Sequence, residues 1–143
     1  GIDHNVLSIE YAKKSGCNAF TVEEFESFMK GRPNLEVFDS IIFPHIIEHL
    51  NDSDAREIVN KYLPYLKCSG SLVFICPQEA GYASDTTHVK FYDIHDLVHL
   101  GETFGFSLSN KFSFPLPRVF GKFLRFNEHV VQMKKSLGKL QYN

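Results

Sequence analysis

The fold is decided by the stretch Phe38-Asp39-Ser40-Ile41-Ile42-Phe43-Pro44-His45-Ile46-Ile47-Glu48-His49-Leu50. Its run Ile41-Ile42-Phe43 is apolar without alternation, which is the pattern of a strand buried on both faces of a parallel sheet. Pro44 has no backbone N–H to donate, so the strand should end there. The polar side chains of His45, Glu48 and His49 follow directly. Ligands of open α/β sheets collect at the carboxyl ends of strands, so we interpret this stretch as a core strand that leads into a functional loop.

The same stretch has two other interpretations. His45-Ile46-Ile47-Glu48-His49 matches H-x-x-E-H, an inverted zinc-peptidase signature. That chemistry requires both histidines on one face of a helix, a third ligand and an open metal position. Because a strand and Pro44 precede the first histidine, we expect no helix through the motif and no stoichiometric zinc. The third interpretation is that these histidines are only packed or solvated loop residues.

Composition limits the class of protein. The chain has 143 residues, of which 43% are hydrophobic, enough for one packed domain over residues 1–143. The net charge of -2 provides no basic field that would recruit nucleic acid. Its three cysteines show no C-x-x-C spacing, which favours a reducing cytoplasm over a disulfide framework. No apolar run approaches the roughly 20 residues of a membrane span.

Strands and helices are expected to alternate along the chain. Helices should begin at Asn5, at the T-x-x-E capping box of Thr21, after Asn51 and at Asp93, and end at Gly16, at Gly31, near Pro64 and at Gly105. Strands are predicted at Cys17–Phe20, Val37–Phe43, Ser71–Cys76, Phe106–Phe114 and Asn127–Lys135. This alternation predicts a mostly parallel sheet with helices on both faces. We expect Val37–Phe43 and Ser71–Cys76 to be adjacent and central, and the last two strands to form an antiparallel pair.

Four segments carry a family pattern in the right order. They are Gly1-Ile2-Asp3 before a helix that ends in Ala12-Lys13-Lys14, Phe38-Asp39-Ser40-Ile41-Ile42 leading to His45–Leu50, the turn Leu66-Lys67-Cys68-Ser69-Gly70-Ser71-Leu72-Val73, and the final strand Asn127–Lys135. Together they resemble the later part of a class I S-adenosylmethionine-dependent methyltransferase, from Gly1 to about Lys135. The turn differs from the family's L-K-P-G-G-x-L in having Cys68-Ser69 in place of Pro-Gly. The resemblance implies a Rossmann-like three-layer α/β/α fold with an antiparallel C-terminal strand.

The resemblance also implies roles for individual residues. Asp3 corresponds to the acidic residue that binds the ribose hydroxyls of the cofactor S-adenosylmethionine, with His4 beside it. Phe43, Pro44 and His45 correspond to the lining of the cofactor's methionine end. Tyr82 and His88 lie on the loop that faces the methyl acceptor, a small molecule, and His88 would be a general base. A loop-anchoring hydrogen bond is the alternative role for His88.

One family feature is missing from the sequence. None of the nine glycines forms the G-x-G of the family's cofactor loop, which belongs before Asp3. We therefore expect a single methyltransferase-like domain that lacks its first strand and helix, with the strand Val37–Phe43 left with an unpaired edge that invites self-association. The predicted function is methyl transfer from S-adenosylmethionine. The alternatives are a catalytically inactive methyltransferase-like binding module and a zinc hydrolase that uses His45, Glu48 and His49.

Overall fold

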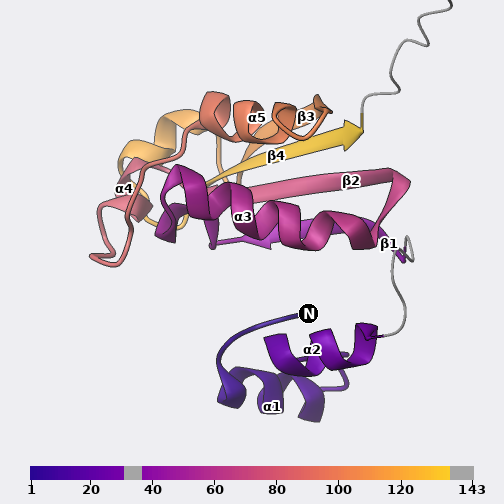
Figure 1. The fold of residues 1–143 in the computed structure, drawn as a ribbon. Coiled ribbons are helices and arrows are strands. Elements are labelled where there is room, and N and C mark those ends of the chain that lie inside the picture. Colours follow the sequence, from indigo (N-terminus) through magenta and orange to yellow (C-terminus); the bar gives the residue numbers. More distant parts are fainter. Residues whose placement is uncertain (31–36, 136–143) are drawn as a thin grey trace, which may run out of the picture. The chain divides into compact units, whose positions relative to one another are not determined.

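The computed structural model describes residues 1–30 and 37–135 and divides the chain into two compact units (Figure 1). The first unit comprises Gly1–Asn34 and the second Leu35–Asn143. Each unit is described by itself, and the prediction that residues 1–143 form one domain stays a prediction. In the described ranges, every helix is too short or too polar to cross a membrane.

The first unit contains two helices that begin where their caps predict. The Asn5 side chain accepts hydrogen bonds from two backbone N–H groups at the start of α1 (Val6–Lys14), and Gly16 follows it with a φ of 81°. Thr21 and Glu24 form the predicted capping box of α2 (Val22–Met29). The expected strand Cys17–Phe20 is reduced to one parallel bridge between Ile2 and Phe20. The expected helix end at Gly31 lies outside the described residues.

The second unit contains a mixed four-stranded sheet in the order β1-β2-β4-β3. The strands are β1 (Phe38–Pro44), β2 (Leu66–Pro77), β3 (Phe106–Phe114) and β4 (Glu128–Lys135). β1 and β2 are parallel neighbours and β4 runs antiparallel to both β2 and β3, as predicted. Of the two strands expected to be central only β2 is. Within the described sheet β1 lies at an edge, as the prediction of an unpaired edge on this strand requires.

Two helices cover one face of this sheet (Figure 1). Residues of α3 (Asp52–Tyr62) and α5 (Ile94–Glu102) share one buried cluster with alternate residues of β2, namely Leu72, Phe74 and Cys76. Pro64 ends α3 as predicted, because the chain continues as a 3-10 turn, η2 (Leu63–Tyr65). Asp93 caps α5 in a capping box, and Gly105 follows that helix with a φ of 78°.

The strand directions bring three loops to one edge of the sheet. β1 ends at Pro44, which is paired with Ile75 near the end of β2. β4 runs the opposite way, so its first residue, Glu128, is paired with Pro77, the last residue of β2. The loop after β1, the loop after β2 with its short helix α4 (Glu79–Tyr82), and the start of β4 therefore meet at the carboxyl ends of β1 and β2.

Candidate functional site

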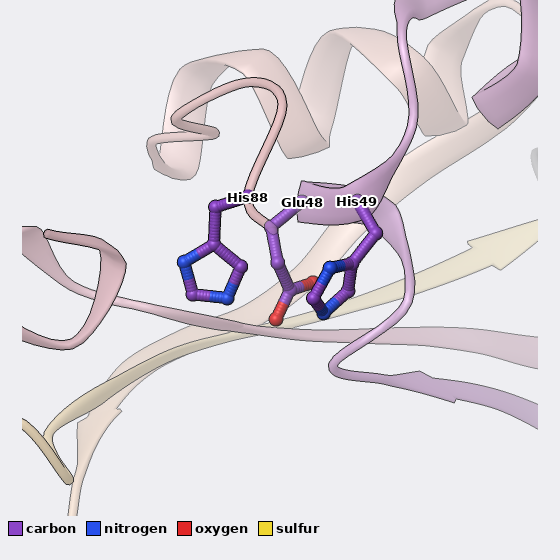
Figure 2. Close-up of side chains that lie close together, drawn as sticks. All are labelled: Glu48, His49 and His88. Atoms are coloured by element: carbon purple, nitrogen blue, oxygen red, sulfur yellow. The ribbon is translucent and has the colours of Figure 1, made fainter. Parts of the chain in front are cut away.

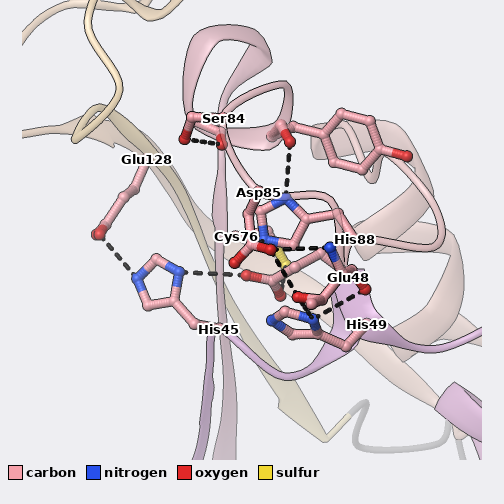
Figure 3. A network of polar contacts seen from close by, with 11 residues as sticks. His45, Glu48, His49, Cys76, Ser84, Asp85, His88 and Glu128 are labelled. Carbon is pink, nitrogen blue, oxygen red and sulfur yellow. Dashed lines mark hydrogen bonds and ion pairs between the residues drawn. The ribbon is translucent and has the colours of Figure 1, made fainter.

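His45 follows the end of β1 and contacts both β2 and the start of β4 (Figure 3). Its Nδ1 lies 3.2 Å from Oε1 of Glu48, and its Nε2 lies 2.8 Å from Oε1 of Glu128. Its backbone N–H donates to the carbonyl of Ile75 at 2.9 Å. His45 adopts a φ of 52°, in the left-handed region that residues other than glycine rarely occupy. These three contacts hold the residue in that conformation.

The two carboxylates around His45 favour its charged form. A carboxylate only accepts hydrogen bonds, so the ring satisfies both partners when each nitrogen carries a proton. The hydrogen bond to Glu48 raises the pKa of His45, and the nearby charge of Glu128 adds to that effect against the cost of burial. The imidazolium therefore provides a counter-charge for Glu48.

Glu48 is buried at this edge, with 1% of its surface exposed. It belongs to a 3-10 turn, η1 (Ile47–His49), that follows β1 directly. The Sγ of Cys76 donates to Oε2 of Glu48 at 3.6 Å, and the backbone N–H groups of Val89 and Lys90 donate to its carbonyl oxygen at 2.8 and 3.2 Å. Burial, followed by the charge of Glu48, raises the pKa of the Cys76 thiol, so this sulfur keeps its proton.

His49 and His88 face each other from the loops after β1 and β2. Their ring centroids are 4.8 Å apart. The Nδ1 of His88 lies 2.8 Å from the carbonyl of Tyr82, and its ring stacks on the Tyr82 ring with centroids 5.2 Å apart. The Nδ1 of His49 lies 3.2 Å from both the carbonyl oxygen and the hydroxyl oxygen of Thr87.

Glu48 lies between these two histidines (Figure 2). One carboxylate oxygen of Glu48 and one ring nitrogen each of His49 and His88 all lie within 4.8 Å of one another. Glu48 is buried and the two histidines are half-buried. This group, which we call the Glu48 cluster, combines one carboxylate with two imidazoles at the place where the strand directions predict a ligand site.

The predicted site residues fall into two groups. Phe43, Pro44, His45, Tyr82 and His88 all lie at the carboxyl edge of the sheet in the second unit. The ring of Phe43 is buried against Phe74, with centroids 5.7 Å apart.

The other two predicted residues lie in the first unit. Asp3 follows the bridge between Ile2 and Phe20, and its Oδ1 accepts from the backbone N–H of Asn5 at 2.8 Å. His4 is exposed, with its Nδ1 3.4 Å from Oδ1 of Asp3.

The H-x-x-E-H interpretation lacks the helix that it requires. η1 is a single 3-10 turn, and His45 precedes it with its left-handed φ. The ring of His45 contacts Glu48 and Glu128, whereas His49 contacts Thr87 and His88. The expectation that no helix runs through the motif is confirmed.

Sequence reasoning did not find the partners that complete this site. It placed Glu48 and His49 in a functional loop and in a zinc motif without naming their partners, and it gave no role to Cys76, Thr87 or Glu128. The available signal was positional, because Cys76 lies at the end of β2, Thr87 on the loop after β2 and Glu128 at the start of β4.

Solved structures are similar to this chain at low sequence identity. No protein-family model matches the sequence, and no curated protein matches it significantly. An S-adenosylmethionine-dependent methyltransferase from Archaeoglobus fulgidus is 15% identical with a TM-score of 0.66, over 94% of this chain and 75% of that one. The 1,6-didemethyltoxoflavin-N1-methyltransferase of Burkholderia thailandensis, solved with 1,6-didemethyltoxoflavin and S-adenosylhomocysteine, is 12% identical with a TM-score of 0.64.

Coverage of the matched proteins is partial. The match to the Burkholderia enzyme covers 94% of this chain and 59% of that enzyme. LepI in complex with S-adenosylmethionine is 13% identical with a TM-score of 0.65, and this chain spans 35% of it. Identities of this size establish a shared fold and leave function to be argued from the site. The chain has the Rossmann-like fold of the class I S-adenosylmethionine-dependent methyltransferases.

Proposed function

We propose that this chain carries the acceptor side, and part of the cofactor site, of an S-adenosylmethionine-dependent methyltransferase. The observation that carries the proposal is the sheet order β1-β2-β4-β3 with β4 reversed, in a fold whose solved relatives include such enzymes. The polar loops that meet at the carboxyl ends of β1 and β2 agree with it, because ligands of open α/β sheets bind there. Cys17, Cys68 and Cys76 form no disulfide with one another, which fits a cytoplasmic setting, and this setting is part of the proposal.

Each unit contributes candidate cofactor contacts of its own. Asp3 would accept hydrogen bonds from the ribose hydroxyls, because its Oδ1 is engaged by Asn5 and its second oxygen remains as an acceptor. His4, beside it, is exposed and would contact the same part of the cofactor. In the second unit Pro44 and His45 would line the methionine end. Phe43 would contribute its backbone, since its ring packs in the core.

The acceptor would lie against the loop that carries Tyr82 and His88. Bound S-adenosylmethionine supplies an electrophilic methyl group on a sulfonium, and its displacement leaves the neutral thioether. The protein aligns the acceptor with that methyl group, and it removes a proton where the acceptor carries one. His88 is the candidate base, because donation from Nδ1 to the Tyr82 carbonyl leaves the Nε2 lone pair. A small-molecule acceptor fits this site, as in the Burkholderia enzyme with its bound 1,6-didemethyltoxoflavin.

Cofactor binding by two versions of the chain tests this proposal. The chain of 143 residues has no G-x-G, so backbone donors that approach the cofactor closely are missing from it. A hydrogen bond to the Asp3 carboxylate is worth about 1.5–3 kcal/mol net. Binding first has to offset about 4 kcal/mol or more for the translational and rotational freedom that the ligand loses. We expect calorimetry to detect little or no binding of S-adenosylmethionine to this chain.

A longer chain that supplies a glycine-rich loop before Gly1 should bind the cofactor. Asp3→Ala should then weaken binding by roughly tenfold or more, as expected for the loss of a hydrogen bond to a charged group. Glu10→Ala, on the neighbouring helix α1, is the control and should bind like the parent chain. Tight binding by the chain of 143 residues, or no effect of Asp3→Ala, would refute this placement of the cofactor site.

The second candidate function is a methyltransferase-like module without activity. A strand followed by G-x-G in sequence before Gly1 would support the enzyme, and its absence there would support the inactive module. The two candidates also differ in one measurement. A longer chain that binds S-adenosylmethionine and methylates no acceptor from a panel of small phenols, amines and carbon acids would support the inactive module.

A further inference from the structure

We propose that Glu48, His49 and His88 form a binding site for one divalent transition-metal ion of the Zn²⁺ or Mn²⁺ type. The three side chains come from two loops that meet at the carboxyl edge of the sheet (Figure 2). This site differs from the H-x-x-E-H signature, because His88 takes the place that the signature gives to His45. The expectation of no zinc rested on the missing helix between His45 and His49, and the Glu48 cluster needs no helix.

The distances in the Glu48 cluster are within reach of a shared ion. Its three candidate ligand atoms lie within 4.8 Å of one another. Metal–ligand bonds of about 2.0–2.2 Å place neighbouring ligand atoms of a tetrahedral ion roughly 3.3 Å apart. The ligand atoms that are farthest apart therefore have to close by at most ~1.5 Å, which small rotations of the two half-buried rings can supply.

The hydrogen bonds around the two histidines fix their tautomers. The Thr87 hydroxyl donates its proton to Oδ1 of Asp85 at 2.7 Å, so both Thr87 oxygens are acceptors toward His49. The Nδ1 of His49 must then carry the ring proton, just as the Nδ1 of His88 does in its bond to the Tyr82 carbonyl. In the neutral form of each ring Nε2 carries the lone pair, and at His88 this atom lies 4.0 Å from Oδ2 of Asp85. A second-shell oxygen on one nitrogen that leaves the other free is the usual arrangement of metal-binding histidines.

Glu48 supplies the charge that such an ion requires. Its carboxylate is buried, and although Oε1 faces His45 and Oε2 faces Cys76, the two oxygens have about four lone-pair sites in total. Burial of a carboxylate is costly unless it is paired or bound to a metal. A cation at this position would thus interact with a fixed negative charge of low solvent exposure.

The ligand set indicates the class of ion. Two imidazoles and one carboxylate suit Zn²⁺, Mn²⁺ or Fe²⁺, whereas Mg²⁺ and Ca²⁺ prefer sets of oxygen ligands. Three protein ligands leave at least one coordination position for water or another oxygen. If the proposed methyl transfer is correct, that position would hold the acceptor through a hydroxyl or carboxylate oxygen, and His88 would act as a ligand rather than as the base.

Calorimetric titration of the chain of 143 residues with ZnCl₂ and MnCl₂ in a non-chelating buffer tests the site without any activity assay. We expect one ion per chain and weaker binding of MgCl₂. His49→Ala and His88→Ala should each weaken binding of the preferred ion at least tenfold. His99→Ala, an exposed histidine on α5, is the matched control and should bind like the parent chain.

Ring nitrogen signals of the seven histidines in the parent chain give a second readout that does not depend on the folding of a variant. Addition of Zn²⁺ should shift Nε2 of His49 and His88 and leave His99 unchanged. The proposal is overturned if no ion binds stoichiometrically. It is also overturned if His88→Ala binds as the parent does while His45→Ala does not, which would assign the site to H-x-x-E-H. Neither result bears on the binding of S-adenosylmethionine, so the two proposals can fail separately.

Discussion

We predict that Gln78 holds the loop after β2 in place. It follows β2 directly and is fully buried. Its Nε2 donates to Oγ of Ser113 and to the carbonyl of Glu128, both at 2.8 Å, and its Oε1 accepts from Nδ2 of Asn127 at 2.9 Å. One side chain therefore ties the end of β2 to the end of β3 and the start of β4.

The expected cost of Gln78→Ala follows from the partners that it leaves behind. The Glu128 carbonyl would lose a partner in a buried place, at about 1–3 kcal/mol for an unsatisfied group. The Asn127 Nδ2 would keep only its longer bond to the Pro117 carbonyl at 3.4 Å and would add part of a second such cost. The Ser113 hydroxyl can rotate to a new partner, and a water molecule that enters the space would recover part of the loss. We expect the unit to lose about 3 kcal/mol, a large share of the roughly 5–15 kcal/mol of a typical domain.

Native-state hydrogen exchange of the β2 and β4 amides measures this loss, since it reports the free energy of opening for that unit. Gln132→Ala is the control, because Gln132 is the same residue type, half-buried on β4, and should cost less than about 1 kcal/mol. Amides of α4 and of the following loop should exchange faster in Gln78→Ala. Equal losses in the two variants would show that the Gln78 hydrogen bonds contribute nothing beyond ordinary packing.

Two further predictions concern a helix cap and the open sheet edge. Hydrogen bonds from the backbone N–H of Asp96 and His95 hold the pKa of Asp93 below its usual value, so its contribution is present above pH ~4 and lost as pH falls through the folded pKa. Asp93→Ala should lower the free energy of unfolding in urea by about 1 kcal/mol at pH 7. Asp93→Asn should keep the cap and make the free energy of unfolding less dependent on acidic pH. If that dependence is unchanged in Asp93→Asn, it arises from another group. At the open edge of β1, Ile42 is 55% exposed, and we expect sedimentation to detect concentration-dependent dimers that Ile42→Lys shifts toward monomer. A parent chain that is monomeric at every concentration contradicts this.

Local chemistry explains which parts of the fold could be predicted from the sequence. The capping box of Thr21 and Glu24, the cap at Asp93 and the break at Pro64 each depend on residues within one helical turn, and all are found. The unbroken apolar runs of β1 and β2 indicated strands buried on both faces, and the two strands are parallel neighbours. The burial predicted for β1 is wrong, because β1 lies at an edge of the described sheet and only its Phe43 is buried. The strand expected at Cys17–Phe20 failed because a strand needs a partner, and local sequence does not specify one.

The candidate site could be located from the sequence but not assembled. Both loops were expected at the carboxyl edge. His49 and Thr87 are 38 residues apart in sequence, and they meet because the intervening α3 and β2 pack in one core. Sequence also gave no sign that His45 would adopt a left-handed φ. That conformation sends the ring of His45 toward Glu128, and the following turn directs Glu48 inward. The segment is not a helix, as the preceding strand and Pro44 predicted, so the H-x-x-E-H spacing does not describe its geometry.

The balance of charge at Glu48 connects these observations. A buried carboxylate has to be paired, and the contact at hand is the His45 imidazolium, whose own pKa is raised mainly by that bond. Glu128 takes the other nitrogen of His45, so one cation is shared between two carboxylates and leaves a net negative charge at this edge. The methyl-transfer proposal places a sulfonium cofactor near His45, and the metal proposal places a divalent ion beside Glu48. Both are cations, and an edge with excess negative charge favours either of them over an anionic ligand.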